Sequence, residues 1–264
     1  MNRIDSQIQK IKTEKRLGLM CHVIVGYPSL EKTINLVKAM EKAGVDFVEL
    51  QIPFSDPLAD GPTIMKACEY SLANGTKVKD AFNIAQKLSK EVSIPLLFMA
   101  YYNTVFRYGT KKFCRYAKQV GVDGLIIPDM PIEEENCEHF IKYCCKYGLK
   151  HIRVVSPAST NKRLIKNAKV ANGFVYFTAR QGITGAKEEL DPDIVANLKK
   201  VRKYFSVPIA VGFGISQKEH FRILKSYVDI IVVGSAIINI INSSVPTEIE
   251  KNVGSFLKDI KMVD

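Results

Sequence analysis

Apolar residues along the chain fall into eight short runs, each separated from the next by an amphipathic segment. The runs read LMCHVIV, FVELQIP, PLLFMAYY, GLIIPDM, HIRVVSP, GFVYFTA, PIAVGFG and DIIVVGS. Each is rich in β-branched or aromatic side chains and apolar at successive positions, which is typical of strands covered on both faces. The pattern therefore predicts eight parallel strands.

The segments between the runs have helical periodicity. Ile34, Val37 and Met40 share one helix face, and the junctions AGVDFVEL, VGVDGLII and YGLKHIRV place a glycine where a helix ends and a strand follows. A further periodic stretch at residues 3–15 predicts an extra N-terminal helix, and residues 247–261 predict the last helix.

Strand and helix alternate eight times with short loops, which predicts the α/β class and a single (β/α)8 TIM barrel domain over residues 1–264. Such barrels usually have roughly 250 residues and often carry a short phosphate-binding helix after strand 8, which we also expect here. An open doubly wound sheet is the structural alternative. That fold usually shows a G-x-G-x-x-G turn after its first strand, and the sequence contains none.

Composition and charge narrow the class of protein. Apolar residues make up 47% and charged residues 25% of the chain, as in ordinary globular proteins. No apolar run approaches the roughly 20 residues of a membrane span, and the N-terminus lacks the apolar core of a secretory signal. We therefore expect a cytoplasmic protein without a membrane partner.

The net charge is +11, but the lysines are spread over every helical segment. This distribution favours a solvated exterior, with some steering of an anionic substrate, over a nucleic-acid surface. The six cysteines form no C-x-x-C pair and mostly lie in apolar stretches. Buried, reduced thiols are therefore expected rather than disulfides.

Glycine-bearing loops follow the runs predicted as strands 6, 7 and 8. They contain Gly182 to Gly185, Gly212 to Gly214, and Gly234 with Ser235. In (β/α)8 barrels a phosphate often lies in such loops, because glycines let backbone N–H groups approach an anion and a helix N-terminus faces it. The pattern predicts a small phosphorylated ligand; the alternative is that these glycines only make tight turns.

Glu49 is a charged residue inside an apolar run. With the strand period of two, Val48 and Leu50 share one face, and Phe47, Glu49 and Gln51 share the other. The aliphatic face suits packing against helices, so Glu49 is expected to point into the barrel. A buried carboxylate without a partner is unfavourable, which favours an acid–base role. The alternative is a glutamate paired with a structural base.

Asp56 and Asp60 follow in the proline- and glycine-rich loop SDPLADGP, which is expected at the catalytic face. Asp56 is equally typical of a turn, and Asp60 is equally typical of a residue that caps the next helix. The spacing alone leaves both alternatives open.

The sequence lacks the residues that other reaction types on this fold would need. A Schiff-base aldolase needs a lysine that projects into the barrel, and Lys150 precedes its strand at the wrong end. A metal site needs clustered ligands, whereas only His22 lies well inside a strand. His139 and His220 fall in predicted helices, and His151 falls at a strand start. A sugar-phosphate epimerase would need a metal or paired Asp and His, so a cofactor-free acid–base lyase is predicted.

The segment VELQIPFSDPLADGPTI resembles the signature of the tryptophan synthase α subunit family at nearly every position. The similarity continues through the segments AYYN, IPDMP, RQGITG, GFGIS and GSA. The resemblance implies a lyase of tryptophan biosynthesis that cleaves indole-3-glycerol phosphate to indole and glyceraldehyde 3-phosphate, with no metal or other cofactor in this chain.

The matching positions imply roles for individual residues. Glu49 is expected to protonate indole C3 and relay the hydroxyl proton, and Asp60 is expected to face the indole N–H. Tyr101 and Tyr176 resemble residues that line the pocket, and Thr184 resembles the residue that positions Asp60. The residues implied to hold phosphate are Gly185, Gly214, Gly234 and Ser235.

The family works with a β subunit that carries pyridoxal phosphate, so the resemblance also implies an allosteric α2β2 heterotetramer. The loop that contains Pro53, Asp56 and Asp60 resembles the part that signals to this partner, and its closure would retain indole.

Positions near the catalytic end depart from the family pattern. Gln51 stands where the signature has glycine, and its amide would fill substrate space or hydrogen-bond Glu49. His22 replaces an apolar aromatic residue, and Ile24 and Tyr27 replace a common Thr and Asp. These changes give an alternative function: a catalytically impaired α subunit kept as an allosteric activator of the β subunit. If Gln51 is the obstacle, Gln51→Gly should raise lyase activity.

Overall fold

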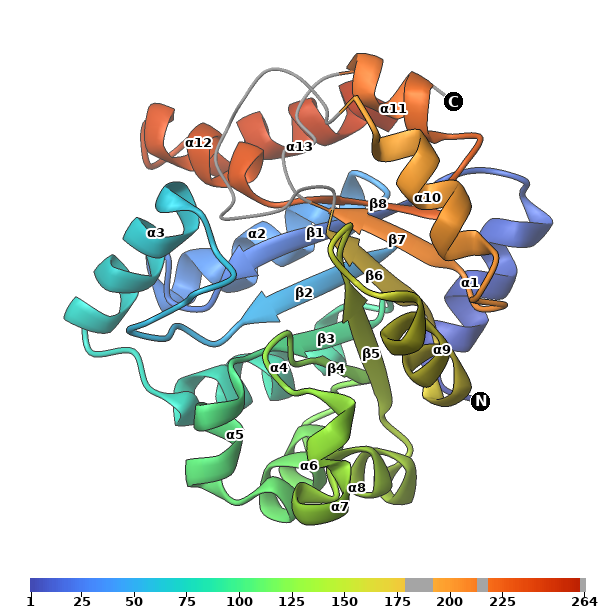
Figure 1. The fold of residues 1–264 in the computed structure, drawn as a ribbon. Coiled ribbons are helices and arrows are strands. Elements are labelled where there is room, and N and C mark those ends of the chain that lie inside the picture. Colours follow the sequence, from blue (N-terminus) through green and yellow to red (C-terminus); the bar gives the residue numbers. More distant parts are fainter. Residues whose placement is uncertain (179–191, 213–217, 262–264) are drawn as a thin grey trace.

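The structure, a computed structural model, describes residues 1–178, 192–212 and 218–261. Parallel strands close into a barrel in chain order, with β8 pairing with β1 (Figure 1). The strands are β1 (Gly18–Ile24), β2 (Phe47–Gln51), β3 (Leu96–Met99), β4 (Gly124–Ile126), β5 (Lys150–Val155), β6 (Val175–Thr178), β7 (Ile209–Gly212) and β8 (Ile230–Val233). The predicted barrel is confirmed, and the open-sheet alternative is wrong.

Helices surround the strands (Figure 1). They are α1 (Arg3–Thr13), α2 (Leu30–Lys42), α3 (Pro62–Ala73), α4 (Val78–Glu91), α5 (Tyr102–Tyr108), α6 (Thr110–Gln119), η1 (Ile132–Glu134), α7 (Glu135–Glu138), α8 (Phe140–Tyr147), α9 (Asn161–Val170), α10 (Ile194–Arg202), α11 (Lys218–Leu224), α12 (Ser235–Ser243) and α13 (Ile249–Lys261). The predicted N-terminal, post-strand-8 and last helices correspond to α1, α12 and α13. Among the described helices, none is long and apolar enough to cross a membrane.

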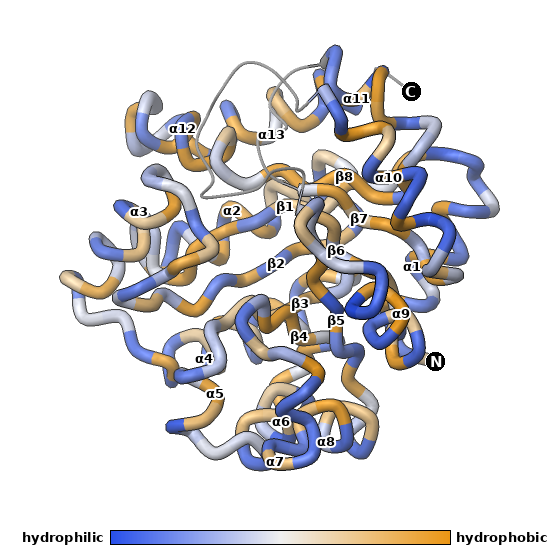
Figure 2. Tube along the Cα trace, viewed as in Figure 1, coloured by the Kyte–Doolittle hydropathy of each residue, from blue (hydrophilic) through white to orange (hydrophobic). Residues whose placement is uncertain are grey.

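Apolar side chains form two layers, because successive strand residues point to opposite faces. Val48 and Leu50 belong to the layer between strands and helices, whereas Phe47 belongs to the layer inside the barrel. Glu49 and Gln51 therefore take inward positions, as the alternation predicts. Figure 2 shows the resulting pattern of apolar strands in the centre and many polar positions on the surrounding helices.

Helix α1 closes the end of the barrel at which the strands begin. Ile4 and Ile11 of this helix are buried and pack with the inward-facing layer. The Asn2 side chain caps α1 and also donates hydrogen bonds to the carbonyl oxygens of Asp123 and Gly148. A ligand therefore reaches the barrel interior from the opposite end.

An Asp or Asn residue lies just before each even-numbered strand. Its side-chain oxygen accepts a hydrogen bond from a backbone N–H of the preceding odd-numbered strand. The pairs are Asp46 with Leu19 (2.9 Å), Asp123 with Leu96 (3.1 Å), Asn172 with His151 (3.0 Å) and Asp229 with Ile209 (2.7 Å). We call these contacts the junction bonds. Arginines also pair with the three carboxylates, namely Arg16, Arg3 and Arg202. The junction bonds join β1 to β2, β3 to β4, β5 to β6 and β7 to β8.

The cysteine and histidine predictions are confirmed only in part. All six cysteines are free, but Cys137 and Cys145 are exposed rather than buried. The prediction that His139 lies in a helix is wrong, because it adopts a left-handed conformation between α7 and α8. His220 lies in α11, as predicted.

Candidate active site

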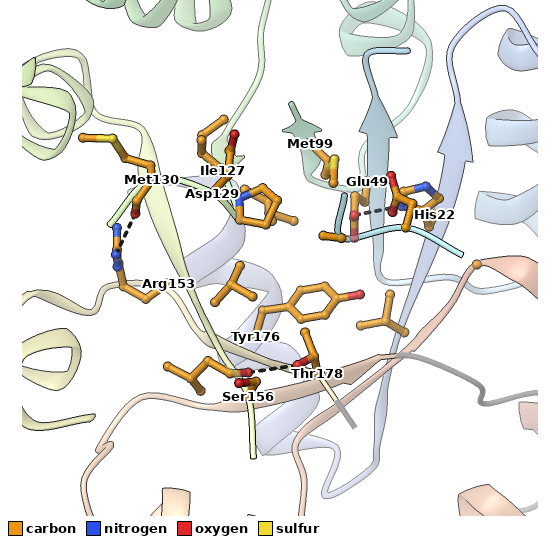
Figure 3. Close-up of a pocket in the computed structure, with 18 of the residues that line it drawn as sticks. His22, Glu49, Met99, Ile127, Asp129, Met130, Arg153, Ser156, Tyr176 and Thr178 are labelled. Carbon is orange, nitrogen blue, oxygen red and sulfur yellow. Dashed lines mark hydrogen bonds and ion pairs between the residues drawn. The ribbon is translucent and has the colours of Figure 1, made fainter. Parts of the chain in front are cut away.

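A cavity of about 410 Å³ opens at the C-terminal ends of the strands. The strand residues that line it include His22, Glu49, Met99, Tyr176 and Val232. Loops after β4, β5 and β8 supply further lining residues. Ligand sites of (β/α)8 enzymes lie at this end of the barrel, so the cavity is the candidate active site (Figure 3).

Glu49 lies on one wall of this cavity and is only 3% exposed. Its Oε1 atom lies 2.8 Å from Nδ1 of His22, which parallel pairing places beside it on β1 (Figure 3). Its Oε2 atom is buried without a hydrogen-bond partner in the described part of the chain. Glu49 is therefore held through one oxygen, while the other can meet a ligand.

Asp60 lies in the loop before α3 and is also 3% exposed. Its Oδ2 atom accepts hydrogen bonds from Gln51 Nε2 at 2.6 Å and from the Tyr101 hydroxyl at 3.0 Å. The Tyr101 oxygen in turn accepts the Ala59 N–H at 2.9 Å, which fixes the loop. The capping alternative is wrong for Asp60, since the N-cap residue of α3 is Gly61 and no side chain caps it.

The cavity favours protonation of both Asp60 and His22. Burial raises the pKa of Asp60 above its ordinary value, although His22, Gln51 and Tyr101 oppose this shift. Burial, the largest single influence, acts to lower the pKa of His22, but the adjacent Glu49 carboxylate and the nearby charge of Asp60 together raise it above the ordinary value. The two shifts follow from desolvation of a charge in one case and an opposite charge nearby in the other.

Tyr176 on β6 extends into the cavity, and its hydroxyl points toward the side that carries Glu49 and His22 (Figure 3). Gly212 on the neighbouring strand β7 leaves room for it, because a Cβ atom there would lie 2.2 Å from the Tyr176 oxygen. Burial raises the pKa of the Tyr176 hydroxyl well above its ordinary value, and the charges of Glu49 and Asp60 add to this effect. Tyr176 is therefore a neutral wall of the pocket.

Gly234 and Ser235 lie at the cavity edge where α12 begins. Gly234 is the N-cap residue and Ser235 the first residue of the helix, so backbone N–H groups of the first turn lie at this edge. Thr184, Gly185 and Gly214 lie outside the described residues. Within the described ranges, no cluster of three or more His, Cys, Asp and Glu side chains could hold a metal ion.

The sequence and fold match one family of known proteins. The family model described as Tryptophan synthase alpha chain matches residues 8–261. The chain belongs to this family. A tryptophan synthase alpha chain from Thermoanaerobacter sp. (strain X514) is 42% identical over 266 residues, which covers 100% of both chains.

Solved structures agree with this assignment to the tryptophan synthase alpha chain family. The crystal structure of tryptophan synthase subunit alpha from Legionella pneumophila str. Paris has a TM-score of 0.90 and 30% identity, covering 100% of this chain and 98% of that chain. A chain of the tryptophan synthase complex from Pyrococcus furiosus has a TM-score of 0.84 and 30% identity, covering 92% of this chain and 97% of that chain. The predicted class, a lyase acting on indole-3-glycerol phosphate, is thereby confirmed at the level of the family.

The residues that depart from the alpha chain pattern lie in different parts of the structure. Gln51 lies inward, but its amide nitrogen binds Asp60, so the prediction that it bonds to Glu49 is wrong. Ile24 packs with Ile64 and other apolar residues in a separate cluster. The Tyr27 hydroxyl bonds to the Asn242 side chain. Neither Ile24 nor Tyr27 is among the residues that line the cavity.

The loop predicted to contact the partner of tryptophan synthase alpha chains leaves β2 next to the cavity. Pro53 is buried, whereas Ser55 and Asp56 are exposed. The Asp56 carboxylate accepts a hydrogen bond from the Ser55 hydroxyl at 2.5 Å, and the backbone carbonyl of Asp56 accepts the Leu58 N–H at 2.9 Å. Asp56 thus forms part of an exposed turn, while Asp60 of the same loop is buried.

The sequence prediction missed Arg153 and Asp129 as lining residues of the cavity. Arg153 is only 6% exposed, and its guanidinium donates to Asn167 Oδ1 at 2.7 Å and to the Met130 carbonyl at 3.1 Å. A signal was present, because an arginine inside the apolar run HIRVVSP is as unusual as Glu49 in its own run. Through the Met130 carbonyl, Arg153 fixes the loop after β4.

Proposed function

We propose that this chain cleaves indole-3-glycerol phosphate to indole and glyceraldehyde 3-phosphate, with Glu49 as the acid–base group and Asp60 as the second carboxylate. The observation that supports this proposal is the pair of buried carboxylates on one cavity, of which Glu49 has an unpartnered oxygen. Buried polar atoms are normally hydrogen-bonded, so an orphan oxygen at a cavity indicates a ligand contact.

The chemistry uses the indole ring as the electron sink. Glu49 takes the proton of its pair with His22 and gives it to indole C3, and the positive charge that develops on the ring nitrogen is stabilised by the Asp60 carboxylate. Glu49 then takes the proton of the adjacent hydroxyl as the C3 side-chain bond breaks, and the bonding electrons return to the ring. The products are indole and the aldehyde, and the pair of Glu49 and His22 recovers its starting protonation state.

We propose that the substrate phosphate is bound by the first turn of α12, with Gly234 and Ser235, and by Gly185 and Gly214 of the neighbouring loops. Thr184 keeps its expected role of positioning Asp60. Support comes from the position of Gly234 and Ser235 at the cavity edge and from the affinity of helix N-termini for anions. Tyr176 would then line the indole portion at the carboxylate side, while Tyr101, which is not among the lining residues, would hold Asp60 toward it.

We further propose that the chain acts in the cytoplasm with a pyridoxal phosphate-dependent β subunit in an α2β2 assembly, and needs no cofactor of its own. The exposed turn at Asp56 supports a partner contact there. Only a few residues of the same loop separate this turn from the buried Asp60. Binding of the partner to this turn would thereby reach the active site directly.

Indole release from indole-3-glycerol phosphate, measured with and without the β subunit, tests the proposal. We expect release that increases with the β subunit, and a loss of roughly 100-fold or more in kcat for Glu49→Gln and Asp60→Asn. Asp56→Asn is the matched control, since it removes an exposed carboxylate from the same loop. Asp56→Asn should leave indole release by the isolated chain unchanged. It should reduce only the increase in release that the β subunit produces. Unchanged activity in Glu49→Gln would disprove the proposed role.

A further inference from the structure

Arg153 is a buried cation on the wall of the cavity that carries the loop after β4 and the start of α9 (Figure 3). Its side chain donates from Nε to Asn167 Oδ1 at 2.7 Å and from Nη2 to the Met130 carbonyl at 3.1 Å. Both acceptors are neutral, and Nη1 makes no hydrogen bond within the described residues. A buried charge normally has an opposite charge beside it. The guanidinium of Arg153 therefore keeps one donor group and most of its charge for a further contact.

The carboxylates on this side of the barrel are engaged elsewhere. Glu135 accepts two backbone N–H groups of α8, Glu133 pairs with Lys166 at 2.9 Å, and Asp129 accepts a backbone N–H at the start of α5 at 2.8 Å. None of these three carboxylates forms an ion pair with Arg153. Burial lowers the pKa of Arg153 below its ordinary value, and the charge of Glu135 opposes this shift only in part.

Two further cations lie near the same wall. The Asn167 amide that binds Arg153 also donates to the Arg163 carbonyl at 2.8 Å, and Lys200 Nζ donates to the Ser159 carbonyl at 3.4 Å. Arg163 and Ser159 line the cavity, and the Ser159 hydroxyl, which accepts a backbone N–H at 3.1 Å, keeps its own proton to donate. Across the described ranges of the chain, neither Arg163 nor Lys200 pairs with a carboxylate. The wall thus presents positive charge and hydrogen-bond donors together.

We propose that this wall is a second anion site, at which a small oxyanion, a phosphate or a carboxylate, binds Arg153 Nη1, Arg163 and the Ser159 hydroxyl. We call it the β5 anion site. An arginine N–H that binds an ionised oxygen forms a charge-assisted hydrogen bond, which is roughly twice as strong as a neutral one. The site is separate from the cavity edge at α12, because β6 and β7 lie between β5 and β8 in the barrel. An anion there would also hold the guanidinium that binds the Met130 carbonyl, and with it the loop after β4.

Titrations of the protein with inorganic phosphate and, separately, with malonate test the β5 anion site. The readout is the Nε–H signal of Arg153 in NMR spectra, because this N–H is buried and hydrogen-bonded to Asn167. We expect a saturable shift of the signal with at least one of the two anions. The shift should persist in Ser235→Glu, in which a carboxylate in the first turn of α12 repels an anion from that edge. No saturable shift with either anion would overturn the inference, and so would a shift that Ser235→Glu abolishes.

Arg163→Gln and Arg222→Gln are matched variants. Both arginines are exposed, but Arg163 lines the cavity, whereas Arg222 pairs with Glu219 on α11. Arg163→Gln should weaken anion affinity roughly threefold, as one exposed charge is lost, and Arg222→Gln should leave it unchanged. Equal affinities of the two variants would contradict the assignment. Because binding is measured without turnover, the result does not depend on the proposed lyase function.

Arg153→Met should abolish binding at the β5 anion site, with the methyl signal of Met130 as the readout. Met130 borders the same cavity, and its carbonyl contacts Arg153 in the wild type. Retained affinity in folded Arg153→Met would overturn the inference. Thermal unfolding shows whether this variant folds, and if it does not, the comparison of Arg163→Gln with Arg222→Gln decides.

Discussion

The buried carboxylate of Asp60 lowers the stability of the folded protein. Asp60 is buried, and desolvation is the largest influence on its pKa, which lies above the ordinary value. A raised carboxyl pKa in the folded state means that the ionised form destabilises the fold. Its hydrogen bonds from Gln51 and Tyr101 reduce this effect without removing it.

Asp60→Asn should therefore stabilise the protein while it abolishes lyase activity. The amide oxygen can accept both existing hydrogen bonds without a buried charge. We expect a rise in Tm of roughly 2–4 °C, which corresponds to about 1 kcal/mol in a domain of this size. Because the folded pKa is raised, the advantage should be small below about pH 4 and should grow as pH rises through the pKa of folded Asp60. Calorimetry across this pH range measures it, and a lower Tm at neutral pH would contradict it.

The same shifts predict the pH dependence of catalysis. Asp60 must be ionised, so kcat/KM should fall as pH decreases through its raised pKa. Protonated His22 offsets the charge of the Glu49 carboxylate 2.8 Å away, so activity should also fall as pH increases through the raised pKa of His22. The pH profile of kcat/KM should be bell-shaped. In His22→Asn the alkaline limb should disappear while the acidic limb stays, and an alkaline limb that persists would assign it to another group.

At the scale of elements, alternation along β2 predicted which side chains face inward, because period and burial are properties of the chain itself. The partner of Glu49 was not predicted, although His22 was visible within the first strand. Its contact depends on the register between β1 and β2, which aligns His22 with Glu49 and which no local pattern encodes. The same reason applies to Asp60, since its contact with Tyr101 joins loops after different strands.

The junction bonds predict effects on stability that local propensity does not. Asp123 accepts the Leu96 N–H and pairs with Arg3, so Asp123→Ala should lower the free energy of unfolding by about 2 kcal/mol, as a charged hydrogen bond is lost. Asp5→Asn is the control, because its pair with Lys150 is more exposed and should contribute less than about 1 kcal/mol. Urea titration distinguishes the two, and equal effects would show that the junction bond contributes little.

At the scale of the molecule, the two ends of the barrel have separate tasks. Helix α1 seals one end with buried isoleucines, while the cavity and its carboxylates occupy the other. The barrel and the helices at its ends were predictable because eight repeats of one pattern reinforce each other. The pocket contents were less predictable, since they combine residues from different repeats.

Ile4→Ala should therefore affect stability and leave catalysis intact. Ile4 is 0% exposed at the sealed end, and a large-to-small change in such a site lowers the free energy of unfolding by about 3 kcal/mol. The kcat for indole release at a temperature well below the transition should stay within about twofold of the wild type. A large loss of kcat in folded protein would show that the two ends are coupled.

The junction bonds also bear on where the chain can be cut and rejoined. Each bond lies within a stretch that runs from one odd-numbered strand to the next even-numbered one, so no bond links residues across the connection between β2 and β3. A circular permutant that begins at the exposed turn around Gly75, between α3 and α4, keeps every one of them inside an uninterrupted segment. One that begins at Gly44 separates Leu19 from Asp46 in the sequence. The first should refold more readily than the second, which would identify the strand pair as the unit from which the barrel assembles.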